Sequence, residues 1–157
     1  LKMNPPLRTA EDALALQAAV ADGTVDCIVT DHAPHAAHEK DCEWEISYFG
    51  CIGLETSLPL MITNMVRTNK LSYTGLVRAM AVNPRRILRL APVKIAAGYK
   101  ADLTLFDPEK KVQITTEYFE SKSKNSAFIG AELYGVATDV FVDGKRVLAN
   151  EVVVPGG

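Results

Sequence analysis

The residue pattern of this chain changes near residue 92, and this change constrains the fold more than any other feature. Up to that point apolar residues recur at helical spacing, interrupted by one β-branched run at residues 25–30. Beyond it, short segments alternate apolar and polar residues, as the strands of a half-exposed sheet do. The sequence therefore predicts an α/β part over residues 1–92 and a small β part over residues 93–157.

The first predicted helix begins at Thr9 and ends before Gly23. A hydroxyl at the N-cap with Glu11 and Asp12 in the first turn is typical of a helix start, and glycine is a typical stop. The run at 25–30, Val-Asp-Cys-Ile-Val-Thr, is short and rich in β-branched residues. We therefore expect it to form a buried strand directly after the helix.

Further helices and strands are expected along the rest of the chain. Pro59 suits the first turn of a helix over residues 59–67, and Asn83 with Pro84 suits the N-cap and first position of a helix over 85–90. Asp143-Gly144 predicts a type I′ hairpin turn. The remaining expected elements are a helix over 74–81 and strands over 101–107, 112–114, 136–142, 146–148 and 152–154.

Composition and charge exclude several classes of protein. The chain is 48% hydrophobic and 23% charged with a net charge of -2, and no basic stripe points to nucleic acid. No apolar run reaches the length of a membrane span. The three cysteines lack a CxxC spacing, so we expect reduced thiols and a cytoplasmic protein. The chain lacks an initiator methionine, and we expect it to be a fragment of something longer.

Asp31 lies where the predicted strand meets a long polar loop over residues 32–50. An aspartate at such a place either caps a turn or presents a carboxylate for chemistry. His32 and His35 lie close behind it in sequence and favour chemistry, because metal-bound or proton-transferring carboxylates have imidazole neighbours. These two histidines and His38 are also a conceivable zinc ligand set, although Pro34 makes their mutual geometry unpredictable.

Two further motifs accompany this loop. Two prolines follow Asn4 and fix the backbone that presents Asn4 and Arg8. Gly50 and Gly53 bracket a loop end, where backbone amides can approach a small ligand closely. Taken alone, each motif also fits an ordinary loop.

Together these motifs resemble the C-terminal part of a dihydroorotase of the class I type, in the amidohydrolase superfamily. The resemblance rests on Asn-Pro-Pro-Leu-Arg at 4–8, Asp-His-Ala-Pro-His at 31–35 and Gly-Leu-Glu-Thr at 53–56. Segments 98–103, 121–125 and 143–145 are similar to the tail of the same family. The resemblance covers essentially the whole chain.

This resemblance implies an α/β fold: the C-terminal part of a TIM (β/α)8 metal-dependent hydrolase barrel over 1–92, then strands of a small composite β-sandwich over 93–157. Residues 25–30 would be the eighth barrel strand, with the active site at the C-terminal face of the barrel. The implied reaction is the reversible, zinc-dependent cyclisation of N-carbamoyl-L-aspartate to (S)-dihydroorotate with loss of water. This reaction is the third step of de novo pyrimidine (UMP) biosynthesis.

The resemblance also implies roles for individual residues. Asp31 would ligate zinc, of which a full-length subunit holds one or two, and would carry the proton of the metal-activated water. The implied substrate-binding residues are Asn4, His35, Phe49 and Gly50. Glu55 and Thr56 are given a structural role, and no direct contact is assigned to His32.

The chain also departs from the family pattern, because it contains no His-x-His pair. A single carboxylate does not hold zinc, which needs three or four ligands. We therefore expect the chain alone to be inactive and to be stable only within the full enzyme. Another cyclic amidohydrolase, of hydantoinase or allantoinase type, is one alternative, and a non-catalytic dihydroorotase-like scaffold of aspartate transcarbamoylase is another. Expected partners are the small-molecule substrate and either a second copy or aspartate transcarbamoylase, with no nucleic acid and no membrane.

Overall fold

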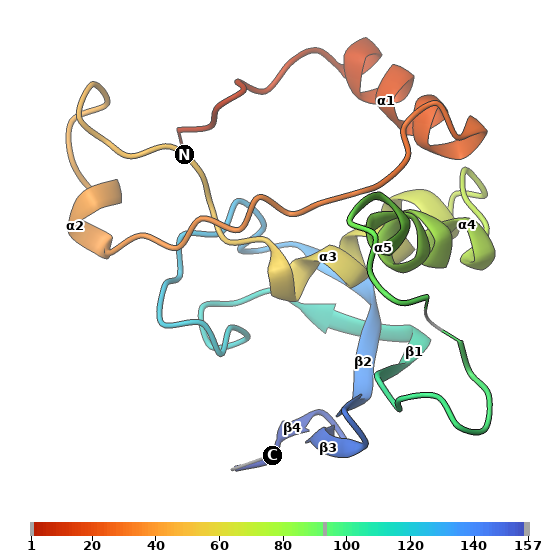
Figure 1. Ribbon diagram of the computed structural model, residues 1–157. Helices are drawn as coiled ribbons and strands as arrows, with labels where there is room; N and C mark the ends of the chain where they lie inside the picture. The colour runs from red at the N-terminus through yellow and green to blue at the C-terminus, as the bar shows by residue number, and fades with distance from the viewer. Residues whose placement is uncertain (1, 93, 156–157) are drawn as a thin grey trace.

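The computed structural model describes residues 2–92 and 94–155 and combines short helices with one antiparallel sheet (Figure 1). The helices lie in the first part of the chain and the strands in the second. The helices are α1 (Ala10–Asp22), α2 (Ala37–Lys40), α3 (Leu54–Met61), α4 (Tyr73–Val77) and α5 (Asn83–Ile87). Two π-helical turns, η1 (Ile62–Val66) and η2 (Arg78–Val82), extend α3 and α4.

Helix α1 confirms the predicted caps. The Thr9 hydroxyl accepts from the Asp12 N–H at 3.3 Å, and the Asp12 carboxylate accepts from the Thr9 N–H at 3.2 Å. This reciprocal pair is a capping box. Gly23 ends the helix with φ +87°, a left-handed conformation that glycine adopts without strain.

Helix α3 begins five residues earlier than predicted, at Leu54, so Pro59 lies inside the helix and not in its first turn. Proline has no N–H, and the Glu55 carbonyl therefore loses its ordinary helical donor. The Tyr118 hydroxyl donates to this carbonyl at 3.0 Å and replaces the missing bond. A distant residue thus makes the internal proline acceptable.

The predicted N-cap at Asn83 is wrong, because α4, η2 and α5 follow one another without a break. The Asn83 side chain donates instead to the Asp26 carbonyl at 2.6 Å. A local capping pattern was therefore overridden by a contact with a segment 57 residues away.

The predicted strand at 25–30 is also wrong in this structure, where these residues pair with no strand of the described chain. The Ile28 N–H donates instead to the Ala79 carbonyl of η2 at 3.1 Å. Val29 is 76% exposed. A buried parallel strand needs neighbouring strands on both edges, and the described residues supply none beside this segment.

The sheet has the order β1 (Leu103–Gln113), β2 (Glu132–Val142), β3 (Lys145–Ala149) and β4 (Val152–Val153), all antiparallel. The two strands expected over 101–114 form the single strand β1, which carries an irregularity between Asp107 and Lys111. Asp143 and Gly144 have φ +50° and +80°. Positive φ at both central residues confirms the predicted I′-type hairpin turn.

Two apolar clusters join the helices to the sheet. One contains Ile52, Ile114, Phe119 and Leu133, and the other contains Ile62, Met65, Leu71 and Leu76. Gly135 of β2 is buried against Ile62, where an added Cβ would lie 2.6 Å from Ile62 Cγ1. The sheet therefore packs directly on α3 and η1. Residue 93, where the predicted β part begins, lies outside the described residues, as does residue 1.

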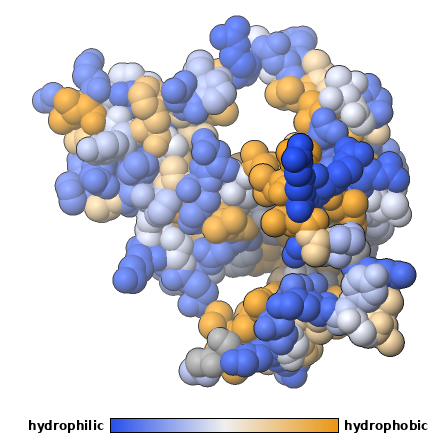
Figure 2. All heavy atoms as spheres, in the orientation of Figure 1, coloured by the Kyte–Doolittle hydropathy of each residue, from blue (hydrophilic) through white to orange (hydrophobic). Residues whose placement is uncertain are grey.

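Much apolar surface is exposed around α1 and the segment that follows it. No residue of α1 is buried, and Leu14 and Leu16 are 55% and 63% exposed. Figure 2 shows an open gap beside α1, below the segment that leads into this helix, with apolar side chains at its edge. Within the described residues, no helix is long and apolar enough to cross a membrane.

Candidate functional site

Asp31 occupies a strained and exposed turn. Its φ is +45°, in the left-handed region that non-glycine residues rarely adopt. Within the part of the chain that the structure describes, its carboxylate makes no hydrogen bond or ion pair. The predicted catalytic residue is thus exposed to solvent at the end of segment 25–30, and not at the tip of a buried strand.

His32, the next residue, is bound to the start of α3. Its Nδ1 accepts from the Gly53 N–H at 3.1 Å and from the Leu54 N–H at 3.3 Å. Gly53 is the N-cap of α3 and provides no side chain for capping. The histidine therefore satisfies N–H groups that the helix start leaves without intrahelical partners.

His35 is the centre of a second network. Its Nε2–H donates to the Phe49 carbonyl at 2.9 Å, and its Nδ1 lies 3.7 Å from a Glu39 carboxylate oxygen. Its ring stacks on Tyr48, with 5.4 Å between ring centroids. His35 thus closes the loop 36–50 back onto its own start.

The predicted substrate-binding backbone at Phe49 and Gly50 is mostly engaged within the protein. The Gly50 N–H donates to the Lys2 carbonyl at 2.8 Å, and the Gly50 carbonyl accepts from the Lys40 ammonium at 3.0 Å. The Phe49 carbonyl accepts from His35. Of the four backbone groups of these two residues, only the Phe49 N–H lacks a partner among residues 2–92 and 94–155.

Asn4 lies at the edge of this arrangement. It is exposed, and its side chain makes no hydrogen bond within the described residues. The bond from Gly50 to Lys2 places the start of the chain beside the loop that leads into α3 (Figure 1). His35, Phe49 and Gly50 are therefore brought together beside Lys2, and Asn4 follows Lys2 by two residues.

Two residues that sequence reasoning left without a role hold this region together. The Asn125 side-chain amide donates to the Ala33 carbonyl at 3.0 Å and to the Gly50 carbonyl at 3.4 Å. The Ser123 hydroxyl accepts from the His35 N–H at 3.1 Å and donates to the His35 carbonyl at 2.6 Å. These partners are 75 to 92 residues apart in sequence, so no local pattern could have revealed them.

Glu55 holds the segment of the chain that leads to Ser123 and Asn125. Its carboxylate accepts from the backbone N–H groups of Glu120, at 2.7 Å, and Ser121, at 3.2 Å. Burial of the phenol, and next the negative charge of Glu55, raise the pKa of Tyr118 above its ordinary value. Glu55 thus has the structural role that we expected for it.

The described residues do not form a metal site by themselves. No group of three histidine, cysteine, aspartate or glutamate side chains gathers in them as ion ligands. His32 and His35 use ring nitrogens for the contacts above, and His38 is exposed. The three-histidine zinc set is therefore wrong for this part of the chain, which offers Asp31 as a single carboxylate ligand.

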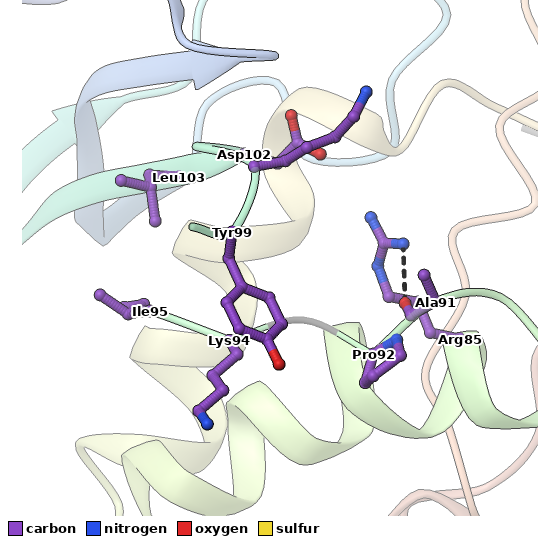
Figure 3. Close-up of a pocket in the computed structure, with 9 residues that line it drawn as sticks. Arg85, Ala91, Pro92, Lys94, Ile95, Tyr99, Asp102 and Leu103 are labelled. Atoms are coloured by element: carbon purple, nitrogen blue, oxygen red, sulfur yellow. Dashed lines mark hydrogen bonds between the residues drawn. The ribbon is translucent and has the colours of Figure 1, made fainter. Parts of the chain in front are cut away.

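A hollow of about 340 Å³ lies between the end of α5 and the start of β1 (Figure 3). Its cationic side chains point in different directions: Arg85 donates to the Ala91 carbonyl, Lys94 lies over Tyr99, and Lys100 pairs with Asp143. A second hollow, of about 430 Å³ beside His35, includes Lys40 and Lys124, whose ammonium groups are bound to backbone carbonyls. The cationic groups named here are thus engaged in contacts within the protein.

The class of protein follows from a comparison with known families, which identifies a hydrolase. The model of the amidohydrolase family matches residues 4–147, and this chain belongs to that family. Enzymes of the family are generally metal-dependent.

Individual proteins that this chain resembles are dihydroorotases in sequence and a hydantoinase in structure. The dihydroorotase of Geotalea daltonii is 48% identical over 146 residues, which cover 93% of this chain and 34% of that protein. The dihydroorotase of Elusimicrobium minutum is 45% identical over 149 residues, covering 95% and 34%. A solved structure, the L-hydantoinase (dihydropyrimidinase) from Arthrobacter aurescens, is 32% identical with a TM-score of 0.90, covering 98% of this chain and 35% of that one. The chain thus spans about a third of the length of the curated relatives that it matches.

Proposed function

We propose that this chain is the part of a dihydroorotase that carries Asp31 and the loop following it. The enzyme would interconvert N-carbamoyl-L-aspartate and (S)-dihydroorotate, the third step of pyrimidine biosynthesis. The observation that carries this proposal is the identity of 45–48% to dihydroorotases over 93–95% of the chain.

The proposed setting is a TIM barrel completed by chain outside the described residues. In that setting residues 25–30, which pair with no strand of the described chain, would gain strand neighbours and form the eighth strand, with 1–92 in the barrel and 93–157 in a small β-sandwich. The exposure of Val29, Leu14 and Leu16 supports this proposal. Covering exposed apolar side chains with neighbouring elements stabilises the folded state.

Asp31 is proposed as the general base and as one metal ligand. In the hydrolytic direction its carboxylate takes a proton from the attacking water and returns it to the leaving amide nitrogen. We propose zinc, one or two ions per subunit, with the remaining ligands supplied from outside the described residues. Alone, the chain would be inactive because one carboxylate does not hold the ion.

The substrate would lie between the Asp31 turn and the loop closed by His35. We propose that the Phe49 N–H and the Asn4 amide, which have no partner among the described residues, contact it. His35 and Gly50 would act mainly by holding the Phe49 backbone in place, since their own polar groups are engaged within the protein.

The test is an assay of the purified full-length protein on dihydroorotate, hydantoin and allantoin. We expect turnover of dihydroorotate, and a fall of about 100- to 10,000-fold in kcat for Asp31→Asn, the range for losing a general acid–base group. Asp41→Asn, in an exposed position of the same loop, is the matched control and should leave kcat unchanged. Absence of dihydroorotate turnover in the metal-loaded protein would refute the proposal.

A hydantoinase is the second candidate, favoured by the TM-score of 0.90 to the L-hydantoinase structure. Turnover of hydantoin without dihydroorotate would establish it. A non-catalytic scaffold is less well supported, because Asn4, Asp31 and His35 are all retained. We further propose a cytoplasmic enzyme, where the free thiols of Cys27, Cys42 and Cys51 stay reduced, working as a homodimer or with aspartate transcarbamoylase.

A further inference from the structure

We propose that His32 is a positioning residue that fixes the Asp31 turn to the first turn of α3. The inference rests on the proposed function for its effect on catalysis, but the clamp itself rests on geometry. Nδ1 of His32 accepts from two successive N–H groups, those of Gly53 and Leu54. These bonds join the residue after Asp31 to a helix that begins 22 residues later in the sequence.

The contact also assigns the tautomer of His32. A ring nitrogen that accepts from two N–H groups must carry its lone pair, so the proton of the neutral ring lies on Nε2. The acceptor also serves a helix end whose N-cap, Gly53, has no side chain to offer. The imidazole therefore takes the place that a serine or aspartate side chain fills at other helix starts.

A second contact holds the residue before Asp31. A Cβ added to Gly53 would lie 3.2 Å from the Thr30 carbonyl oxygen and 3.3 Å from Thr30 Cβ, so the start of α3 lies directly against Thr30. Thr30 and His32 are thus both held by α3, while the carboxylate between them has no partner in the described chain. This arrangement fixes the backbone of Asp31 and leaves its side chain available.

The clamp predicts a particular kinetic effect. The groups proposed to bind substrate are held by other bonds, those of the His35 ring to Phe49 and of Asn125 to Ala33 and Gly50. Loss of the His32 bonds should therefore make the position of the Asp31 carboxylate less fixed without removing a contact to the substrate. We expect kcat to fall about 2- to 30-fold while KM stays within about twofold, the range for losing a helix cap.

Three substitutions separate this role from a chemical role of the ring. His32→Asn keeps an acceptor near the Nδ1 position and should retain most of the activity and of the protection of the Gly53 and Leu54 amides against hydrogen exchange. His32→Gln places its amide near the Nε2 position, and His32→Ala removes both. Both should lose the protection and lower kcat. Rescue by glutamine but not asparagine, or equal loss in all three variants, would overturn the proposal.

A measurement on the unsubstituted protein keeps the test independent of variant folding and of turnover. Nitrogen-15 NMR of the His32 ring should show an unprotonated Nδ1 and a protonated Nε2 at neutral pH, with a coupling across the bond to the Gly53 amide. The opposite tautomer would overturn the clamp even in an active enzyme. The expected tautomer in a protein that does not turn over dihydroorotate would leave the clamp intact and refute the proposed reaction.

Discussion

Gly50 provides the sharpest test of how the candidate site is packed. Its φ is +99°, and an added Cβ would lie 2.6 Å from the Cβ of Ala33. Gly50→Ala therefore introduces a disfavoured backbone conformation, which costs about 1–2 kcal/mol, and an overpacked contact, which costs about 1–3 kcal/mol. We expect the free energy of unfolding to fall by about 2–5 kcal/mol in total.

Two variants separate these contributions. Gly130 has a similar φ of +93° with nothing within 4 Å of an added Cβ, so Gly130→Ala should show the conformational cost alone. Ala33→Gly in the Gly50→Ala background removes the clashing atom and should recover the stability that was lost to overpacking. The double-mutant cycle with Ala33→Gly alone isolates that coupling from the effect of each single change.

The assay is urea unfolding of the full-length protein followed by far-UV circular dichroism, with hydrogen exchange of the Gly50 amide as the local readout. The Gly50 amide, which donates to Lys2, should exchange faster in Gly50→Ala than in the unsubstituted chain. Equal destabilisation by Gly50→Ala and Gly130→Ala, or no recovery on adding Ala33→Gly, would show that the two segments are not in contact as described.

Three other substitutions test the contacts that hold the sheet and the loop 118–121. Hydrogen bonds, first from Arg146 and then from Thr138, lower the pKa of Asp139 in the folded protein. The ionised Asp139 carboxylate therefore stabilises the fold above the ordinary pKa near 4, and this stabilisation is lost as the pH falls through the lower folded pKa. Asp139→Asn should therefore flatten the acid limb of a plot of urea midpoint against pH, and an unchanged limb would contradict this. Glu55→Gln should lower the free energy of unfolding by about 1.5–3 kcal/mol, because one charged acceptor of two backbone N–H groups is lost, with faster exchange of the Glu120 and Ser121 amides as the check. Tyr118→Phe should cost about 0.5–1.5 kcal/mol at pH 7 by removing the bond to the Glu55 carbonyl. Because the pKa of Tyr118 is raised, the stabilisation by its protonated hydroxyl persists up to the ordinary pKa near 10 and is lost as the pH rises further. In urea titrations above pH 10, Tyr118→Phe should therefore lose less stability with rising pH than the unsubstituted protein does.

The candidate site could be predicted from sequence only in part. The motif at 31–35 led to Asp31 and His35, and the structure places Asp31 in an exposed turn and His35 at the centre of a loop network. The same motif gave His32 no direct contact, although this residue makes two bonds to the start of α3. No local pattern identifies a histidine as the cap of a helix that begins more than 20 residues later.

The sequence by itself determined the features that depend on neighbouring residues. The capping box of Thr9 and Asp12, the stop at Gly23, the hairpin turn at Asp143-Gly144 and the alternating strands of the second part all form through contacts within a few residues or through local backbone preference. The caps of α1 and the hairpin turn lie where the residue pattern predicted them, while the predicted strands 101–107 and 112–114 merge into β1 and β2 begins earlier than predicted.

Only the tertiary structure decided the rest. Residues 25–30 have strand composition but lack strand partners, helix α3 begins at the point where His32 caps it, and Ser123 and Asn125 hold a loop that precedes them by 75 to 92 residues. Strand pairing, distant capping and side-chain clamps depend on which segments meet in space. These contacts cannot be predicted from a residue's immediate neighbours in the sequence.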